Sequence, residues 1–136
     1  MRQFSVKTQS KVEFIDITER VHSMLIQTFV REGVCYIFIP HTTAGLTINE
    51  NADFAVVRDI VMELNKIVPE DDNYAHAEGN SAAHIKASLV GFHLVVPVEG
   101  GRLALGRWQG IYLCEFDGPR TRKIVMTALS ESTMPT

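Results

Sequence analysis

The sequence predicts a single α+β domain, in which two main helices cover one side of a β-sandwich-like arrangement of mixed sheets. Short segments of alternating apolar and polar residues, rich in β-branched and aromatic side chains, recur along the chain and are typical of strands. Only two long segments repeat their apolar residues at helical spacing. With 136 residues, the chain can form one domain with its own core, so we assign residues 1–136 to one domain.

The first elements along the chain are strands and a helix. Residues 2–7 and 11–17 alternate around a short turn, and this pattern predicts an opening β-hairpin. A helix is expected next, with Thr18 as its N-cap and Gly33 just past its C-terminus. The nearly continuous apolar run at 34–40 then predicts a strand at the centre of its sheet, covered on both faces.

The middle of the chain contains the second helix and a long polar loop. The helix is predicted from Asp53, its N-cap, to Lys66, because apolar residues recur there at helical spacing. The loop at 69–81 is acidic and polar. A loop of this length in a small domain more often contributes to function than merely connects two elements. A short helix is expected over 83–91.

The last third of the chain is predicted to be strands. They cover 92–98, 102–106, 108–118 and 122–129, separated by glycine-containing turns. These apolar strands present more surface than two helices can cover. We therefore expect the protein to form an oligomer that buries the surplus.

Composition and charge exclude several classes of protein. The net charge is −3, the sequence pI is about 5.9, and Lys and Arg are scattered, which argues against nucleic acid as a partner. No apolar stretch approaches the roughly 20 residues that span a bilayer, and the N-terminus lacks the apolar core of a signal peptide. Cys35 and Cys114 lie in strand-like runs and are expected to be buried free thiols. We expect a cytoplasmic protein with no membrane contact.

Three histidines lie in polar, glycine-containing segments where a site is expected. His41 follows the buried strand and opens HTTAGLTINE, whereas His76 and His84 flank EGNS. Imidazole is a common metal ligand and acid or base near neutral pH. We expect the three rings to lie in one polar pocket, close enough to share one divalent ion or one phosphate. The competing interpretation is that these segments only close turns.

The neighbours of these histidines suit either a metal or a phosphate. Two or three histidines with a carboxylate such as Glu50 or Glu78 would suit Zn²⁺ or another divalent ion. A metal-free site is the alternative, in which hydroxyl groups donate to phosphate oxygens. The residues expected to bind ligand are Thr42, Thr43, Asn49, Ser81 and Arg120.

One carboxylate is expected inside a strand. If residues 109–117 are extended, Glu115 shares a face with Ile111 and Leu113, so its charge needs a partner. Glu115 either forms an ion pair with Arg120 or Arg122 or contributes to the functional site, and the sequence leaves both alternatives open.

Three segments together resemble the YjbQ-like family of small proteins. They are HTTAGLTINEN, AEGNSAAHIKASLVG and VPVEGGRLALGRWQGIYLCEFDGPRTRK, in this order, within about Val34 to Val125. The resemblance implies a compact α+β fold around a β-sandwich, a homotrimer, and a polar site built from the histidine-bearing segments near subunit contacts.

Some members of this family are catalogued as secondary thiamine-phosphate synthases, so the resemblance implies an enzyme that joins a pyrimidine diphosphate to a thiazole phosphate and releases pyrophosphate. His41, His76, His84 and Glu50 would be the catalytic residues, with the three histidines as ligands of a divalent metal, Zn or Mg. The alternatives are a metal-dependent hydrolase or a trimeric protein that binds a small phosphorylated ligand.

Overall fold

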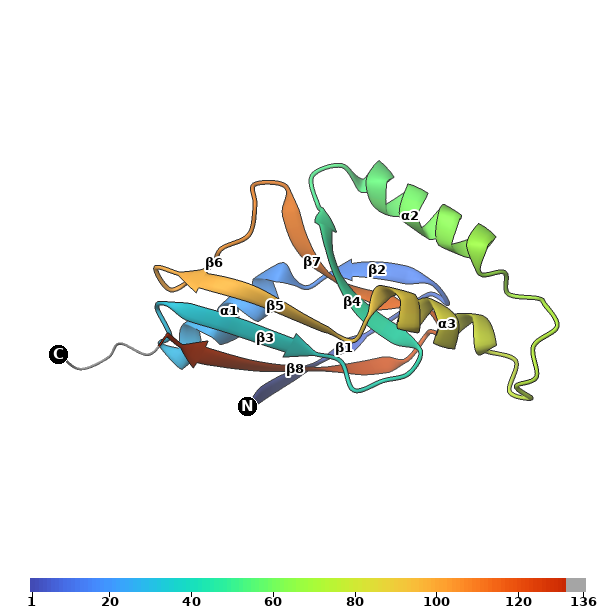
Figure 1. Ribbon diagram of the computed structural model, residues 1–136, viewed down its shortest axis with the longest axis horizontal. Helices are drawn as coiled ribbons and strands as arrows, with labels where there is room; N and C mark the ends of the chain where they lie inside the picture. The colour runs from blue at the N-terminus through green and yellow to red at the C-terminus, as the bar shows by residue number, and fades with distance from the viewer. Residues whose placement is uncertain (132–136) are drawn as a thin grey trace.

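Two antiparallel sheets and three helices form the fold in the computed structural model, which describes residues 1–131 (Figure 1). In chain order the elements are β1 (Arg2–Lys7), β2 (Glu13–Asp16), α1 (Thr18–Thr28), β3 (Gly33–Phe38), β4 (Ala44–Glu50), α2 (Phe54–Ile67), α3 (Ser81–Val90), β5 (His93–Glu99), β6 (Arg102–Leu103), β7 (Gln109–Glu115) and β8 (Thr121–Ser130). The larger sheet has the order β1-β8-β3-β5-β6 and the smaller one β2-β7-β4. The predicted α+β class is confirmed.

Two details of the predicted architecture are wrong. The expected short helix does form, as α3, but the sheets are antiparallel rather than mixed. The opening hairpin does not form, because β1 pairs with β8 in one sheet and β2 pairs with β7 in the other. Alternation in a sequence tells which face of a strand is buried, but it does not identify the neighbouring strand.

The smaller sheet is the middle layer of the molecule, and β7 divides two cores. Ile111 and Leu113 face a large core shared with α1 and the inner face of the larger sheet. On the opposite face of β7, Tyr112, Cys114 and Phe116 pack beneath α2 and α3. A strand buried on both faces explains why residues 110–114 of β7 carry no charged side chain.

Helix ends follow the sequence only in part. The predicted N-cap Asp53 is confirmed, since its side chain accepts a hydrogen bond from the backbone N–H of Ala55. Thr18 is instead the first residue of α1, and its hydroxyl contacts Asp16. This helix ends at Thr28, well before Gly33, and the C-cap Phe29 reverses the chain with a φ of 59°.

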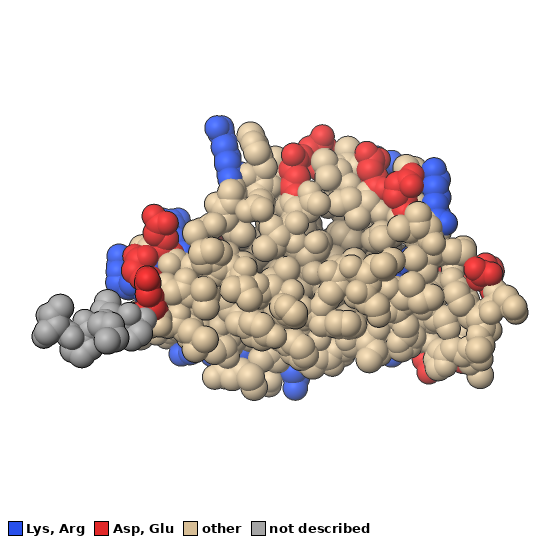
Figure 2. Space-filling view, in the orientation of Figure 1, with Lys and Arg blue, Asp and Glu red and all other residues tan. Residues whose placement is uncertain are grey.

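The prediction that β3 is central is confirmed, but only its inner face is covered within the chain. Three rows of exposed or half-buried side chains cross β8, β3 and β5 on the outer face of the sheet. The rows are Leu129, Val34 and Pro97; Thr127, Tyr36 and Val95; and Val125, Phe38 and His93. Figure 2 shows this outer face largely free of charged side chains, which gather along its rim.

Both cysteines are buried and free, as the sequence predicts. Burial raises the pKa of Cys35 to about 11, so this thiol stays protonated and unreactive near neutral pH. Among residues 1–131, no helix is both long enough and apolar enough to cross a membrane.

Candidate functional site

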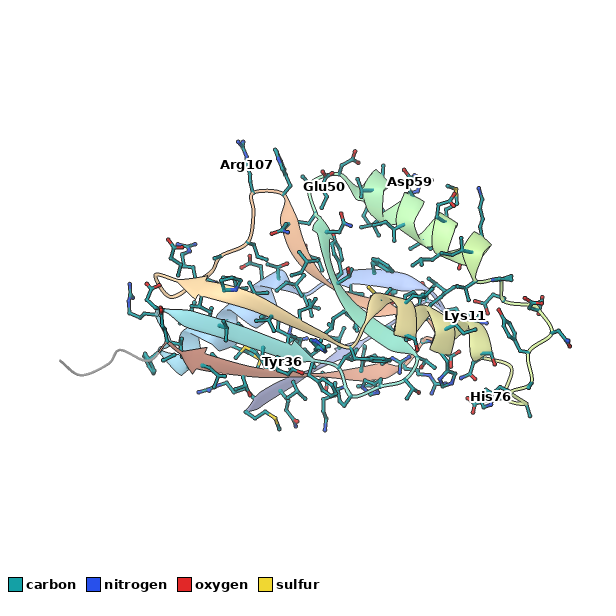
Figure 3. The ribbon with its side chains drawn as sticks, viewed as in Figure 1. Lys11, Tyr36, Glu50, Asp59, His76 and Arg107 are labelled. Carbon is teal, nitrogen blue, oxygen red and sulfur yellow. The ribbon has the colours of Figure 1, made fainter. Side chains whose placement is uncertain are left out.

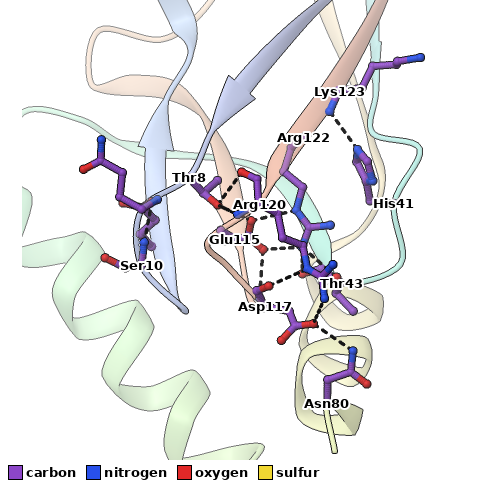
Figure 4. A network of polar contacts seen from close by, with 12 residues as sticks. Thr8, Ser10, His41, Thr43, Asn80, Glu115, Asp117, Arg120, Arg122 and Lys123 are labelled. Atoms are coloured by element: carbon purple, nitrogen blue, oxygen red, sulfur yellow. Dashed lines mark hydrogen bonds and ion pairs between the residues drawn. The ribbon is translucent and has the colours of Figure 1, made fainter. Parts of the chain in front are cut away.

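A buried ion pair fixes the region where the two sheets meet (Figure 4). Glu115 is fully buried and Arg122 is 3% exposed. The Nε of Arg122 donates to Glu115 at 2.8 Å, and its Nη2 donates to both the other carboxylate oxygen and the hydroxyl of Thr43. Thr8 donates its hydroxyl to Glu115 at 2.7 Å. Of the two partners that the sequence left open for Glu115, Arg122 is the one that pairs with it.

These contacts hold Glu115 in its charged form. Burial by itself raises the pKa of this carboxyl group, but the hydrogen bonds from Arg122, from the amide of Asp117 and from Thr8 outweigh burial and hold the pKa below its usual value. All of these donors to the Glu115 carboxylate belong to the same chain. Glu115 is therefore a structural anchor.

The network continues from Asp117 to the start of α3. Arg120 donates to one carboxylate oxygen of Asp117 at 2.8 Å, and the amide of Asn80 donates to the same oxygen at 3.0 Å. Asn80 also donates to Glu78 at 3.0 Å, so it ties the loop that carries His76 to the turn after β7. The side-chain oxygen of Asn80 is buried and has no partner among the described residues.

His76 and His84 come together at the beginning of α3. Their ring centroids are 5.5 Å apart, and the rings meet edge to face. With Tyr74, Ser81 and Ile85 they line a surface pocket of about 350 Å³, which we call the histidine pocket. Ser81 therefore lies near both histidines, and its expected role in binding a ligand stays a prediction.

His41 lies in a different hollow. Its Nε2 accepts a hydrogen bond of 2.9 Å from the backbone N–H of Lys123 (Figure 4). Around it, Phe38, Pro40 and Phe92 line a mostly apolar depression of about 340 Å³, which we call the His41 hollow. Thr42 also lines this hollow, whereas Thr43 is buried and its hydroxyl accepts a hydrogen bond from Arg122.

The chain by itself does not bring the three histidines into one pocket. His76 and His84 meet, but His41 belongs to the separate hollow. Among residues 1–131, no group of three His, Cys, Asp or Glu side chains is placed to hold a metal ion. The expectation of one shared pocket within a single chain is therefore wrong, because the bond to Lys123 holds His41 at the end of β3.

Glu50 and Asn49 lie away from the histidines. Both are at the far end of β4, where they pair with Gln109 and Gly110 of β7. A seven-residue strand separates its ends by roughly 20 Å, and Figure 3 shows Glu50 and His76 in different parts of the molecule. Within the chain, the expectation that Glu50 joins the histidines in one site is wrong, because LTINE is extended and carries Glu50 to the far end of β4.

Sequence reasoning missed two residues of the network. Thr8 lies 107 positions from Glu115 in the chain, and no local pattern connects them. Asn80 carried one signal, since it lies shortly before the helix predicted over 83–91, and asparagine often caps the first turn of a helix. In the structure its side chain does not cap α3 but holds Asp117 and Glu78 instead.

Comparison with known proteins identifies the relatives of this chain. The model of the family described as "UPF0047 protein YjbQ-like" matches residues 2–131. The UPF0047 protein YugU of Bacillus subtilis is 50% identical over 123 residues, which are 90% of this chain and 93% of YugU. A Clostridium acetobutylicum crystal structure of the same family has a TM-score of 0.93 at 50% identity, covering 95% of this chain and all of that one.

A more distant solved relative has the same fold. The Sulfolobus solfataricus protein is 32% identical, with a TM-score of 0.92 and coverage of 96% of both chains, and it is described as a protein of unknown function. The relatives from Methanocaldococcus jannaschii and Bacillus subtilis carry only UPF0047 names. None of these names records thiamine-phosphate synthase or transferase activity, so the activity implied by the sequence resemblance is corrected. The matches over almost the whole chain do establish that it belongs to the YjbQ-like UPF0047 family.

Proposed function

We propose that this protein binds a small phosphorylated molecule at the histidine pocket, with a divalent metal ion held by His76 and His84. The observation that carries the proposal is the edge-to-face pair of imidazoles, 5.5 Å between centroids, in an open pocket. Two imidazoles that ligate one tetrahedral ion place their ring centres about 5 Å apart, given a metal–nitrogen distance of about 2 Å.

The start of α3 favours an anionic ligand beside these rings. Asn80 makes no side-chain cap, so the first amide groups of α3 lack a side-chain acceptor. The N-terminus of a helix attracts anions through these amides and through its dipole. Ser81, which lines the pocket, adds a hydroxyl donor at the same place.

Two histidines are fewer protein ligands than a catalytic zinc ion usually has. The remaining positions would fall to water, to oxygens of the ligand or to a side chain of another subunit. Such an ion would supply positive charge for phosphate oxygens. The two imidazoles and the Ser81 hydroxyl, which line the same pocket, would orient the ligand.

The test of the metal site is the zinc content of purified protein after dialysis. We expect bound zinc in the parent protein and at least tenfold weaker retention in His76→Ala and in His84→Ala, because each change removes a ligand. Both side chains lie near the surface, so the melting temperature of the metal-free protein should hardly change.

The control is His22→Ala, on α1 and away from the pocket. It should retain zinc like the parent. Zinc retained by the His76 and His84 variants, or absent from the parent under loading conditions, would refute the metal site.

We further propose that three copies of the chain assemble through the outer face of the larger sheet. The nine outward positions on β8, β3 and β5 include Val95 and Leu129, which are 55% and 59% exposed in the single chain. Contiguous apolar faces of this kind are uncommon on monomers and typical of contacts between copies. The proposed number of three comes from the family resemblance.

A charge placed on this face should dissociate the assembly. Val95→Lys would bury an unpaired ammonium in the contact, so we expect sedimentation at micromolar concentration to shift from a trimer toward the 15.2 kDa monomer. Ser23→Lys, exposed on α1 at the other side of the sheet, should remain a trimer. A parent protein that sediments as a stable monomer would rule the assembly out.

A further inference from the structure

The hydrogen bond to His41 determines which of its nitrogens carries a proton. The donor is the backbone N–H of Lys123, which can only donate, and the acceptor is Nε2 at 2.9 Å. A ring nitrogen that accepts a hydrogen bond has no proton of its own. In a neutral imidazole the proton is therefore on Nδ1, and His41 offers an N–H donor at that atom.

The surroundings of His41 favour the neutral ring. Burial lowers the pKa of His41, and the positive charges of Arg122, Lys123 and Arg120 lower it further, against an opposing effect of Glu115. The second ring nitrogen is directed away from Lys123 (Figure 4). A neutral N–H donor fixed by the backbone is suited to polarising a carbonyl or phosphoryl oxygen, without the cost of desolvating a charge.

The rest of the His41 hollow combines an apolar wall with one polar group. Phe38, Pro40 and Phe92 supply flat apolar surface, and Thr42 adds a hydroxyl at its edge. Phe38 also belongs to the outer face of the larger sheet, so a neighbouring subunit in the proposed trimer would form a further wall. A ligand that fits this hollow has an oxygen acceptor attached to a compact apolar group.

We propose that His41 is a hydrogen-bond donor, through Nδ1–H, to a phosphoryl oxygen of a phosphate ester whose organic part packs against Phe38 and Phe92, and that it is not a metal ligand. This assigns a second ligand site, the His41 hollow, separate from the histidine pocket, and it rests on the proposed function only for the phosphate. The positive charges of Arg122, Lys123 and Arg120 around His41 favour an anionic group there. Metal ligation by Nδ1 would require loss of its proton, while Nε2 is already occupied by the amide of Lys123.

The first test is the tautomer of His41, which requires no ligand. Long-range proton–nitrogen NMR of protein labelled with ¹⁵N-histidine distinguishes the two neutral tautomers, and His41→Asn identifies which signals belong to His41. We expect the Nδ1–H form at pH 7.5. The Nε2–H form or a doubly protonated ring would overturn the proposal.

The second test measures binding of phenyl phosphate to metal-free protein by calorimetry. His41→Asn places an amide N–H near the position of Nδ1, whereas His41→Gln places its amide near Nε2, where it can accept from Lys123. We expect His41→Asn to bind within about threefold of the parent. We expect His41→Gln to bind about tenfold more weakly or worse, since a hydrogen bond to a charged group is lost.

The opposite order would show that His41 serves only to hold Lys123, and the proposal would fail. It would also fail if the parent did not bind phenyl phosphate, or if His41→Gln lost zinc as His76→Ala is expected to do. A protein that retains no zinc but binds phenyl phosphate in the expected order would refute the metal at the histidine pocket and leave the role of His41 intact.

Discussion

Arg122→Met should lower the free energy of unfolding by about 3–5 kcal/mol, because it leaves the Glu115 carboxylate buried without its counter-charge. Thr8 and the amide of Asp117 would remain as donors, but neither carries a charge. The loss is a large share of the roughly 5–15 kcal/mol that stabilises a typical domain. Urea unfolding followed by circular dichroism measures it directly.

Two further variants make this experiment decisive. Arg120→Met removes the exposed partner of Asp117 and should cost less than about 1 kcal/mol. The double variant Arg122→Met with Glu115→Leu removes both buried charges and should recover most of the stability, since a buried pair often gains little over apolar residues of similar volume. If Arg122→Met cost no more than Arg120→Met, the pair would not be the anchor described.

Gly45→Ala should destabilise the protein by about 1–3 kcal/mol through a backbone collision. A Cβ at Gly45 would lie 2.7 Å from the carbonyl oxygen of Gly91, just after α3, and 3.1 Å from a methyl carbon of Val90. That same carbonyl accepts the N–H of Leu46 at 3.0 Å, so the chain cannot move away without losing this bond. The thermal midpoint should fall by several degrees.

The matched control is Gly106→Ala. There the nearest atom to a new Cβ is the side-chain oxygen of Gln109 at 3.2 Å, which accepts a hydrogen bond from the N–H of Gly106, and a shift of a few tenths of an ångström relieves the contact. We expect a change within about 0.5 kcal/mol. Equal effects at the two glycines would contradict the close approach of β4 to α3 as the reason for Gly45.

The backbone contact at Gly45 is not readable from the sequence. A glycine after HTTA resembles a backbone position left open for an anion, and the sequence does not distinguish that use from close packing of two backbones. In the structure Gly45 faces Gly91, so it lets α3 lie against β4. Since α3 begins with Ser81 and contains His84, this contact helps to place the histidine pocket.

Properties that depend on neighbouring residues in the chain were readable from the sequence. The two faces of β7, the cap of α2 at Asp53 and the central position of β3 follow from alternation, capping and continuous apolar character. The pairing of His76 with His84 was also accessible, since they flank one short segment that ends in a helix.

Contacts between distant segments were decided only by the tertiary structure. Pairing of β1 with β8, the bond from Thr8 to Glu115 and the placement of His41 on the amide of Lys123 each join residues more than 80 positions apart. No local pattern encodes such partners, because alternation fixes which face of a strand is buried and leaves its neighbour open. The sequence by itself thus determined the elements and the histidine segments, whereas packing of the two sheets determined which side chains share a site.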